Sequence, residues 1–212
     1  MEYPLLASLT PEDRRSVLST ARRRRFAAGE VIVHEGDPGD AFHLIAKGRV
    51  GVRVTTPGGS VVLVNVHGRG SAVGEQALID RAARRSATIT ALEPTETLSL
   101  SREAFDDLRR RHPGVDRLLI EVLSAEVRRL TNRLAEALYE SAETRVLRRL
   151  VDLDAIYEGN IPLTQDSVAS MAGTTRPTAN GVLRTLVTEG VLVLRRGRIE
   201  VLDRAALVAR AR

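Results

Sequence analysis

The sequence predicts an α+β fold with three parts: an antiparallel β-roll, one long helix, and a compact C-terminal unit of short helices and a β-hairpin. Three observations predict this class. Short β-branched runs separated by turn residues occupy the region from about residue 26 to 101, and an apolar heptad pattern follows from about 115 to 138. Two short helical patterns and a hairpin pattern come last. We expect domain boundaries at 1–113, 114–139 and 140–212.

The first expected element is a helix over residues 9–22. Thr10 can cap it, Pro11 suits the first helical position, and acidic residues fill the first turn. The β-region follows, in runs such as AFHLIAKGRVGVRVT, SVVLVNV and ETLSLS. Turn sequences separate the runs, among them GDPGD at 36–40 and TPGGS at 56–60. Many short strands at this spacing are typical of a jelly roll, also called a double-stranded β-helix.

A long helix is predicted next, with apolar residues in steps of three and four. These are Ile120, Leu123, Val127, Leu130, Leu134 and Ala137. The pattern is that of a parallel dimerisation helix, because a roll this small can hardly cover almost three heptads. The alternative is a helix that packs on its own roll. A break follows at YESAET, residues 139–144, where Ser141 is expected to cap a helix from about 144 to 157.

The C-terminal unit has the pattern of a winged helix-turn-helix. Thr164 can cap a first short helix that stops at Gly173, and Thr175 can cap a second one in which Pro177 falls in the first turn. The run VLVLRRGRIEVLD then predicts two strands around a turn at Arg196. Two short helices joined by a tight turn and followed by a β-wing are a DNA-binding arrangement.

Several residues of this unit are candidates for contact with double-stranded DNA. The second helix would enter the major groove, where Arg suits guanine and Asn suits adenine. Its candidates are Thr175, Arg176, Thr178, Asn180, Gly181 and Arg184. Thr164, Gln165 and the wing residues Arg195, Arg196 and Arg198 are better placed for phosphates. The alternatives are solvated helix faces or a winged helix that binds protein.

Composition and charge are typical of a soluble, globular protein with a basic C-terminal part. Residues 161–212 hold eight arginines and four acidic residues, a balance of +4, whereas residues 1–160 hold 24 basic and 23 acidic residues, a balance of +1. Such an excess is expected where a chain meets a polyanion, although an arginine-rich composition alone could produce it. The absence of cysteine excludes disulfides and thiolate catalysis. Without a signal-peptide pattern or a long apolar run, we expect a cytoplasmic protein that does not enter the membrane.

The segment GEQALIDRAARRSAT, residues 74–88, has the groups that a small cyclic phosphodiester requires. Arg85 can fork onto phosphate oxygens and Ser86 can donate a further hydrogen bond. Glu75 can accept a hydrogen bond from a ribose hydroxyl, and Gly74 allows close approach of the backbone. The plainer alternative is a surface turn with a Glu–Arg ion pair.

Four segments in order give the chain a resemblance to the Crp/Fnr superfamily of bacterial transcription regulators. GEVIVHEGDPGDAFHLIAKGRVGV resembles the first hairpins of the family's roll, and GEQALID with RRSATITAL resembles its phosphate-binding cassette. The heptad helix is similar to the family's dimerisation helix, and LTQDSVASMAGTTRPTANGVLRTLVTEGVL is similar to its helix-turn-helix. The resemblance covers essentially the whole chain.

The resemblance implies a homodimer that binds a two-fold symmetric DNA operator under the control of a cyclic nucleotide, with cAMP favoured and cGMP the other option. Gly74 and Glu75 would face the ribose, and Arg85 and Ser86 the cyclic phosphate. In cAMP-responsive relatives, polar residues of the dimer helix contact the adenine, one of them from the other subunit; here Thr131 and Asn132 are the nearest such pair. RNA polymerase is a further partner that the family implies. The alternative is a family member that binds DNA without a nucleotide or senses another small ligand.

The second helix of the helix-turn-helix departs from the pattern usual in cAMP receptors. Where those proteins show Arg-Glu and a second Arg one turn later, this chain has Arg176-Pro177 and Gly181. The cytosine-reading glutamate and the second arginine are thus missing. The operator sequence is expected to differ from the usual one, while its two-fold symmetry is expected to persist.

An enzyme is the competing class, for example a phosphodiesterase, and the sequence speaks against it. The four histidines, at positions 34, 43, 67 and 112, show no metal-ligand spacing. No Ser/His/Asp or Cys/His constellation and no carboxylate pair suited to acid–base work is evident. We therefore expect no catalytic residues and no metal site.

Overall fold

The computed structural model describes residues 3, 6, 7, 9–79, 82 and 84–211. The chain forms two compact units. The first consists of Met1–Val61 and Asn65–Arg129, and the second of Val62–Val64 and Leu130–Arg212.

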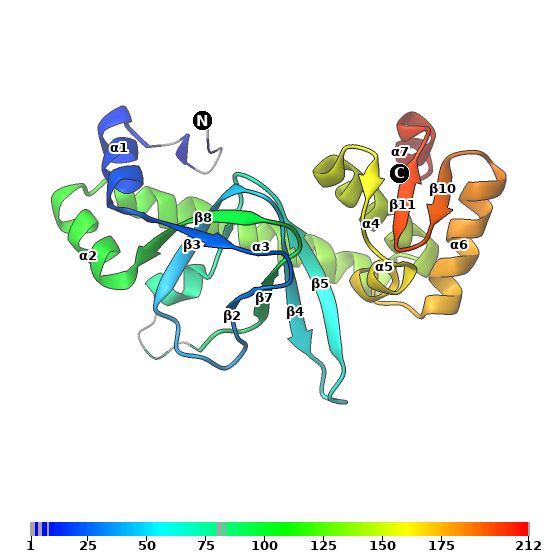
Figure 1. Cartoon of the computed structure of the whole chain (residues 1–212), viewed down its shortest axis with the longest axis horizontal. Coiled ribbons are helices and arrows are strands. Elements are labelled where there is room, and N and C mark those ends of the chain that lie inside the picture. The colour runs from blue at the N-terminus through cyan, green and yellow to red at the C-terminus, as the bar shows by residue number, and fades with distance from the viewer. Residues whose placement is uncertain (1–2, 4–5, 8, 80–81, 83, 212) are drawn as a thin grey trace. The chain divides into compact units, whose positions relative to one another are not determined.

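Two four-stranded antiparallel sheets form the roll (Figure 1). One sheet has the order β1-β8-β3-β6, with β1 at Arg22–Phe26, β8 at Thr95–Ser101, β3 at Ala41–Lys47 and β6 at Ala72–Val73. The other has the order β2-β7-β4-β5, with β2 at Val31–Val33, β7 at Thr88–Ala91, β4 at Val50–Thr55 and β5 at Val61–His67. The short strands and the turns between them confirm the predicted jelly roll.

Strand β1 was not predicted, because the sequence pattern of the roll begins only at about residue 26. Its sequence RRRRF lacks the alternation of a half-buried strand. Arg22–Phe26 pair along their whole length with β8, and Arg23 and Arg25 both bond the carboxylate of Glu96. The strand therefore forms because β8 offers it a complementary edge, not because of its own composition.

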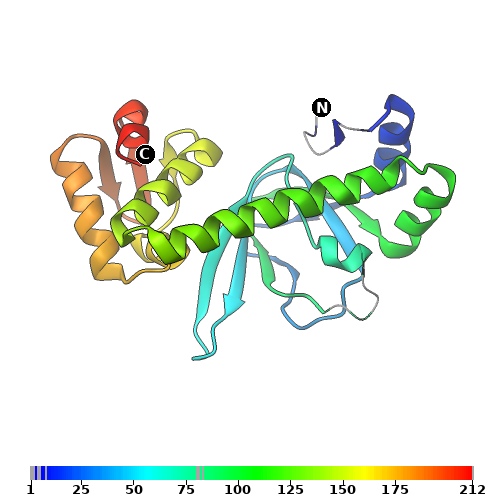
Figure 2. The ribbon, with the colours of Figure 1, turned by 180° about the vertical axis from the view of Figure 1, so that it is seen from behind.

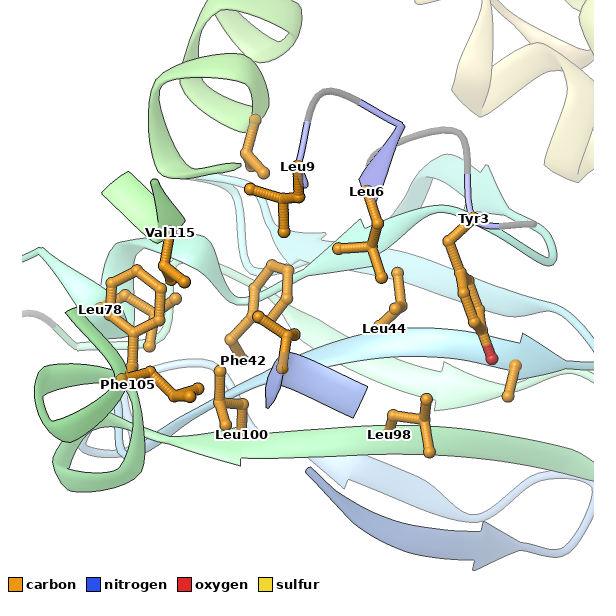
Figure 3. Packing of buried hydrophobic residues seen from close by; sticks show 14 residues of the cluster. Tyr3, Leu6, Leu9, Phe42, Leu44, Leu78, Leu98, Leu100, Phe105 and Val115 are labelled. Atoms are coloured by element: carbon orange, nitrogen blue, oxygen red, sulfur yellow. The ribbon is translucent and has the colours of Figure 1, made fainter. Parts of the chain in front are cut away.

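The hydrophobic core of the roll lies between its first sheet and the helices around it (Figure 3). Helix α1 spans Pro11–Thr20 and is capped as predicted, with the Thr10 hydroxyl accepting from the amide of Asp13 at 3.1 Å. Helix α2 spans Arg102–Arg111. Phe105 of α2 is fully buried and packs with Phe42 and Leu100 of the sheet and with Leu78 and Val115.

Helix α3 spans Val115–Tyr139 as one uninterrupted helix (Figure 2). Its first part packs on the roll, where Val115 and Val122 are buried. The heptad residues Ile120, Val127, Leu130 and Leu134 instead leave between 52 and 62% of their surface exposed. An exposed apolar stripe of this length is the surface expected of a helix that pairs with a second copy.

The C-terminal unit is a winged helix-turn-helix with additions that the sequence analysis missed. Helix α4 spans Ala142–Tyr157, α5 spans Gln165–Met171, and α6 spans Arg176–Thr188. Strands β10 at Leu192–Arg195 and β11 at Arg198–Val201 form the predicted wing. A third strand, β9 at Asn160–Ile161, pairs with β11, and helix α7 at Arg204–Arg210 follows the wing. Ser141 caps α4 as predicted, so that helix begins at 142 rather than at 144.

Candidate functional sites

Arg85 lies just before β7 and pairs with the loop that precedes β3. Its amide donates to the carbonyl of Asp37 at 2.8 Å, and its carbonyl accepts from the amide of Gly36 at 2.8 Å. A β-bridge joins Pro38 to Arg84. The turn at 36–40 and the segment around Arg85 thus form one structural element, although the sequence analysis treated them separately.

Gly74 and Arg85 are in contact, as the predicted anion site requires. Gly74 has φ 81°, in the left-handed region, and precedes the short 3-10 helix η2 at Glu75–Leu78. A Cβ at position 74 would lie 2.5 Å from Nη1 of Arg85 and 3.1 Å from the carbonyl oxygen of Ala41. Glycine therefore serves two purposes here, because it adopts this backbone conformation and leaves room for the guanidinium.

The guanidinium of Arg85 is buried beside an exposed carboxylate. Nη2 of Arg85 lies 2.9 Å from Oδ1 of Asp40, and the two side chains are 5% and 86% exposed respectively. Ser86 is exposed and Glu75 is half-buried. Arg85 is thus a buried cation that touches a glycine turn, and its counter-ion in this ion pair is solvated. Such a cation is suited to bind an anion.

His43 on β3 lies next to this cation and is itself buried. Its Nδ1 is 3.1 Å from Oγ1 of Thr97, and its ring packs edge-on against Phe26. Burial, and after it the positive charge of Arg85, lower the pKa of His43 to about 4. The imidazole is therefore neutral at physiological pH, which avoids a second cation beside the anion site.

This pKa predicts a loss of stability on mild acidification. The pKa of His43 is about 4 in the folded state, whereas its ordinary value in an unfolded chain is 6.5. Between pH 6.5 and pH 4 the unfolded chain therefore binds a proton at His43 and the folded chain does not, which favours unfolding. At pH 5 the His43 contribution should have fallen by about 2 kcal/mol relative to pH 7. Denaturant unfolding of wild type and His43→Gln should show this difference, with the exposed His34→Gln as control. Parallel pH profiles for wild type and His43→Gln would contradict it.

Thr131 and Asn132 are exposed on α3 and belong to the second unit, so their contact with a purine stays a prediction. Arg129, one turn earlier, belongs to the first unit and was not singled out from the sequence. It bonds Glu126 at 2.8 Å, and this bond, together with the nearby charges of Glu126 and Glu75, raises the pKa of Arg129. The carboxylate expected to face the ribose therefore interacts electrostatically with the dimer helix.

Ser16, His112 and Asp13 form a Ser–His–Asp relay, so the prediction that the chain has no such constellation was wrong. Oγ of Ser16 lies 3.1 Å from Nε2 of His112, and Nδ1 of His112 lies 3.1 Å from Oδ1 of Asp13. These residues are 96 and 99 positions apart in the chain, which hid the arrangement. Ser16 lies in the interior of α1, where helical hydrogen bonds occupy the backbone amides that an oxyanion hole would need. The relay therefore joins α1 to the end of α2 and does not form a hydrolytic centre.

Both helices of the helix-turn-helix begin at the predicted caps. The Thr164 hydroxyl accepts from the amide of Ser167 at 3.1 Å, and the Thr175 hydroxyl accepts from the amide of Thr178 at 3.3 Å. On α6 the residues Arg176, Thr178, Gly181 and Arg184 are exposed, and Asn180 is half-buried. The face proposed to enter the major groove is thus free within this unit, with the partly covered Asn180 at its margin.

A cleft of about 400 Å³ lies between the helix-turn-helix and the wing. Its lining includes Thr164, Gln165 and Arg176 on one side and Arg195 and Arg198 on the other. Glu200 bonds Arg198 at 3.0 Å and lies 3.6 Å from Arg195, so part of the wing's positive charge is compensated. Arg196 lies exposed at the tip of the hairpin. The cleft is thus lined by three arginines and by the carboxylate of Asp166, with Glu200 close to two of the arginines.

Comparison with known proteins identifies both domains of the chain. Residues 23–112 match the cyclic nucleotide-binding domain family, and residues 132–210 match the Crp-like helix-turn-helix domain family. The chain is 37% identical over 207 residues to the cyclic AMP receptor protein of Thermus thermophilus, covering 96% of this chain and 94% of the relative. The chain belongs to the Crp/Fnr family of transcription regulators.

Solved structures of Crp/Fnr regulators share the fold. The Thermus thermophilus catabolite activator protein is 35% identical, with a TM-score of 0.58 and coverage of 98% of both chains. The c-di-GMP-responsive regulator CLP of Xanthomonas campestris reaches a TM-score of 0.75 over 91% of this chain and 99% of its own, but at 20% identity it shows the fold alone. Crp/Fnr proteins are regulators rather than enzymes, and their helix-turn-helix implies DNA binding.

Two further features of this Crp/Fnr chain bear on its chemistry. Within the residues that the structure describes, no helix has the length and apolar character needed to cross a membrane. The same residues contain no group of three or more His, Cys, Asp or Glu side chains able to hold a metal ion.

Proposed function

We propose that the protein is a homodimeric transcription regulator whose affinity for DNA is controlled by a cyclic nucleotide, cAMP, bound in the roll. The buried guanidinium of Arg85 against Gly74 carries the proposal, because it provides a cation for a phosphate beside a glycine turn. Arg85 and Ser86 bind the cyclic phosphate, and Gly74 and Glu75 face the ribose. The name of the Thermus relative supports cAMP as the nucleotide.

The dimer helix is proposed to carry the signal. The exposed seam of α3 packs against the same seam of a second copy, and Thr131 and Asn132 beside it contact the purine, one of them from the partner subunit. The nucleotide then favours one arrangement of the paired helices. Its effect on DNA binding can be only as large as its difference in affinity for the two arrangements.

The DNA target is a two-fold symmetric operator. Arg176 reads guanine, and Thr178, Asn180, Gly181 and Arg184 complete the major-groove surface, while Thr164, Gln165 and Arg196 hold phosphates. The cap residue Thr175 orients this helix. Such a regulator works in the cytoplasm, where RNA polymerase is a candidate partner.

The test begins with DNA selected from a random pool by the protein in the presence of cAMP. Affinity for the selected site, measured at one fixed salt concentration, should increase at least about tenfold with cAMP. Arg176→Ala should lose about 1–3 kcal/mol for that site and relax the choice of base at one position, whereas Arg196→Ala should weaken binding to all sequences alike.

Two other outcomes have defined meanings. Equal operator affinity with and without cAMP, cGMP and c-di-GMP would leave a DNA-binding regulator that is constitutive or senses another ligand. An asymmetric selected site, or one chain per site, would contradict the dimer.

A further inference from the structure

The ion pair between Arg85 and Asp40 is unequal. Arg85 is buried against Gly74 and fixed by its backbone bonds to Gly36 and Asp37, whereas 86% of the Asp40 side chain is exposed. The carboxylate therefore occupies part of the guanidinium's hydrogen-bonding surface without being enclosed there. Because its carboxylate is solvated, this pair is weak, and another anion can readily replace the carboxylate.

The backbone of Asp40 is nevertheless held in place. Its carbonyl oxygen accepts from the amide of Arg102 at 3.1 Å, and Nη2 of Arg102 donates to the carbonyl of Gly39 at 3.0 Å. Arg102 is buried at the start of α2. When a ligand displaces the carboxylate from Arg85, Asp40 can therefore swing toward solvent but cannot leave the neighbourhood of the site.

We propose that Asp40 determines which phosphate charge the site accepts, admitting a cyclic phosphodiester and disfavouring a phosphomonoester such as 5′-AMP. The inference rests on the proposed function and names a specificity residue within it. A phosphodiester carries one negative charge, whereas a phosphomonoester carries about 1.5 to 2 at pH 7. Repulsion from a tethered carboxylate grows with the charge of the ligand, so Asp40 penalises the monoester more. Glu75, in the same cassette, adds charge of the same sign.

The experiment compares two ligands of the same nucleoside that differ by one methyl group on the phosphate and by the negative charge that this group removes. These are 5′-AMP and its O-methyl ester, a phosphodiester of the same nucleoside, and cAMP is titrated beside them by calorimetry. The proteins are wild type, Asp40→Asn and Asp37→Asn. Asp37→Asn is the matched control, because it removes the same charge from the same loop while the backbone carbonyl that binds the amide of Arg85 remains.

Asp40→Asn should bind 5′-AMP about tenfold more tightly than wild type does, and should bind the methyl ester and cAMP only about threefold more tightly. The advantage should shrink as salt is raised from about 0.1 to 1 M. Asp37→Asn should change the ratio of the affinities for 5′-AMP and its methyl ester much less. Because the ratio for one variant is compared with the ratio for another, the contribution of the methyl group itself cancels.

The outcomes separate the two levels of the proposal. If wild type binds no cyclic nucleotide, the proposed ligand function fails and the role of Asp40 falls with it. If wild type binds cAMP but Asp40→Asn changes the charge ratio no more than Asp37→Asn does, only the inference is overturned. Weaker cAMP binding by Asp40→Asn also overturns it, since Asp40 would then be orienting Arg85 for the ligand.

Discussion

Replacement of Arg85 by alanine is expected to weaken cAMP binding at least about 100-fold while leaving the roll folded. Removal of one member of a buried, hydrogen-bonded charge pair costs about 2–5 kcal/mol, and the cyclic phosphate would be left in a desolvated site without its cation. The fold should tolerate the change, because the partner Asp40 is exposed and becomes fully solvated when Arg85 is lost. Calorimetry with cAMP measures the first effect and thermal unfolding the second.

Arg84→Ala is the matched control for this experiment. Arg84 is the adjacent residue and is exposed, and its Nη1 donates to the carbonyl of Gly36 rather than pointing toward Gly74. It should retain nucleotide affinity to within a few fold. Arg85→Lys should lie in between, since lysine keeps the charge but cannot form the planar fork. Wild-type affinity in Arg85→Ala would remove Arg85 from the nucleotide site.

Most of the roll and both helices of the helix-turn-helix could be predicted because their signals are local. Thr164 and Thr175 cap helices through bonds to amides three residues away. Gly48 separates β3 from β4 with φ 83°, a backbone conformation that glycine adopts readily. Each of these constraints can be seen within a few residues of sequence or in a simple alternation of residue types.

The elements that were missed depend on distant partners or on short signals. Strand β1 needs the edge of β8, and the two-residue strand β9 needs β11. Helix α7 has a local signal that was overlooked, since the side chain of Asp203 caps it by accepting from the amide of Ala206 at 2.9 Å. The pattern of an aspartate directly before the apolar segment RAALVAR predicts a capped helix and would have identified α7.

The candidate anion site was only partly predictable. Gly74 and Arg85 were identified from their spacing and from the family resemblance, and the structure places them in contact. The counter-ion Asp40 lies 45 residues before Arg85 in the sequence. It belongs to the segment GDPGD, which was interpreted only as a turn between strands. The lowered pKa of His43 depends on its burial and on the position of Arg85 beside it, and a sequence shows neither of these.

The ion-pair network around Arg149 links α3 to α4 within the second unit. Arg149 is buried and bonds Glu136 of α3 at 2.6 Å and Asp152 of α4 at 3.0 Å. Arg145 donates to the carbonyls of Ala172 and Gly173, in the turn of the helix-turn-helix. The last turns of α3 are thus tied through α4 to the helix-turn-helix, along the route that the proposed ligand signal would take.

Arg149→Met should therefore destabilise the second unit by about 3 kcal/mol, because it removes the buried cation that bonds Glu136 and Asp152 and leaves Glu136 the longer 3.4 Å ion pair with Arg148. Arg148→Met, on the same helix, is the matched control. Arg148 is 30% exposed and pairs with Glu140 at 3.0 Å and with Glu136 at 3.4 Å, so its loss should cost about 1 kcal/mol or less. Burial already raises the pKa of Asp152, and the charge of Arg149 opposes that rise. Without Arg149 the pKa of Asp152 should rise further, so the folded variant binds a proton at Asp152 more readily than the unfolded chain does. The loss of unfolding free energy relative to wild type should therefore become smaller as the pH falls from 7 to 5. Denaturant unfolding of both variants and wild type at the two pH values measures this, and a deficit that is small or independent of pH would show that Arg149 does not neutralise these carboxylates.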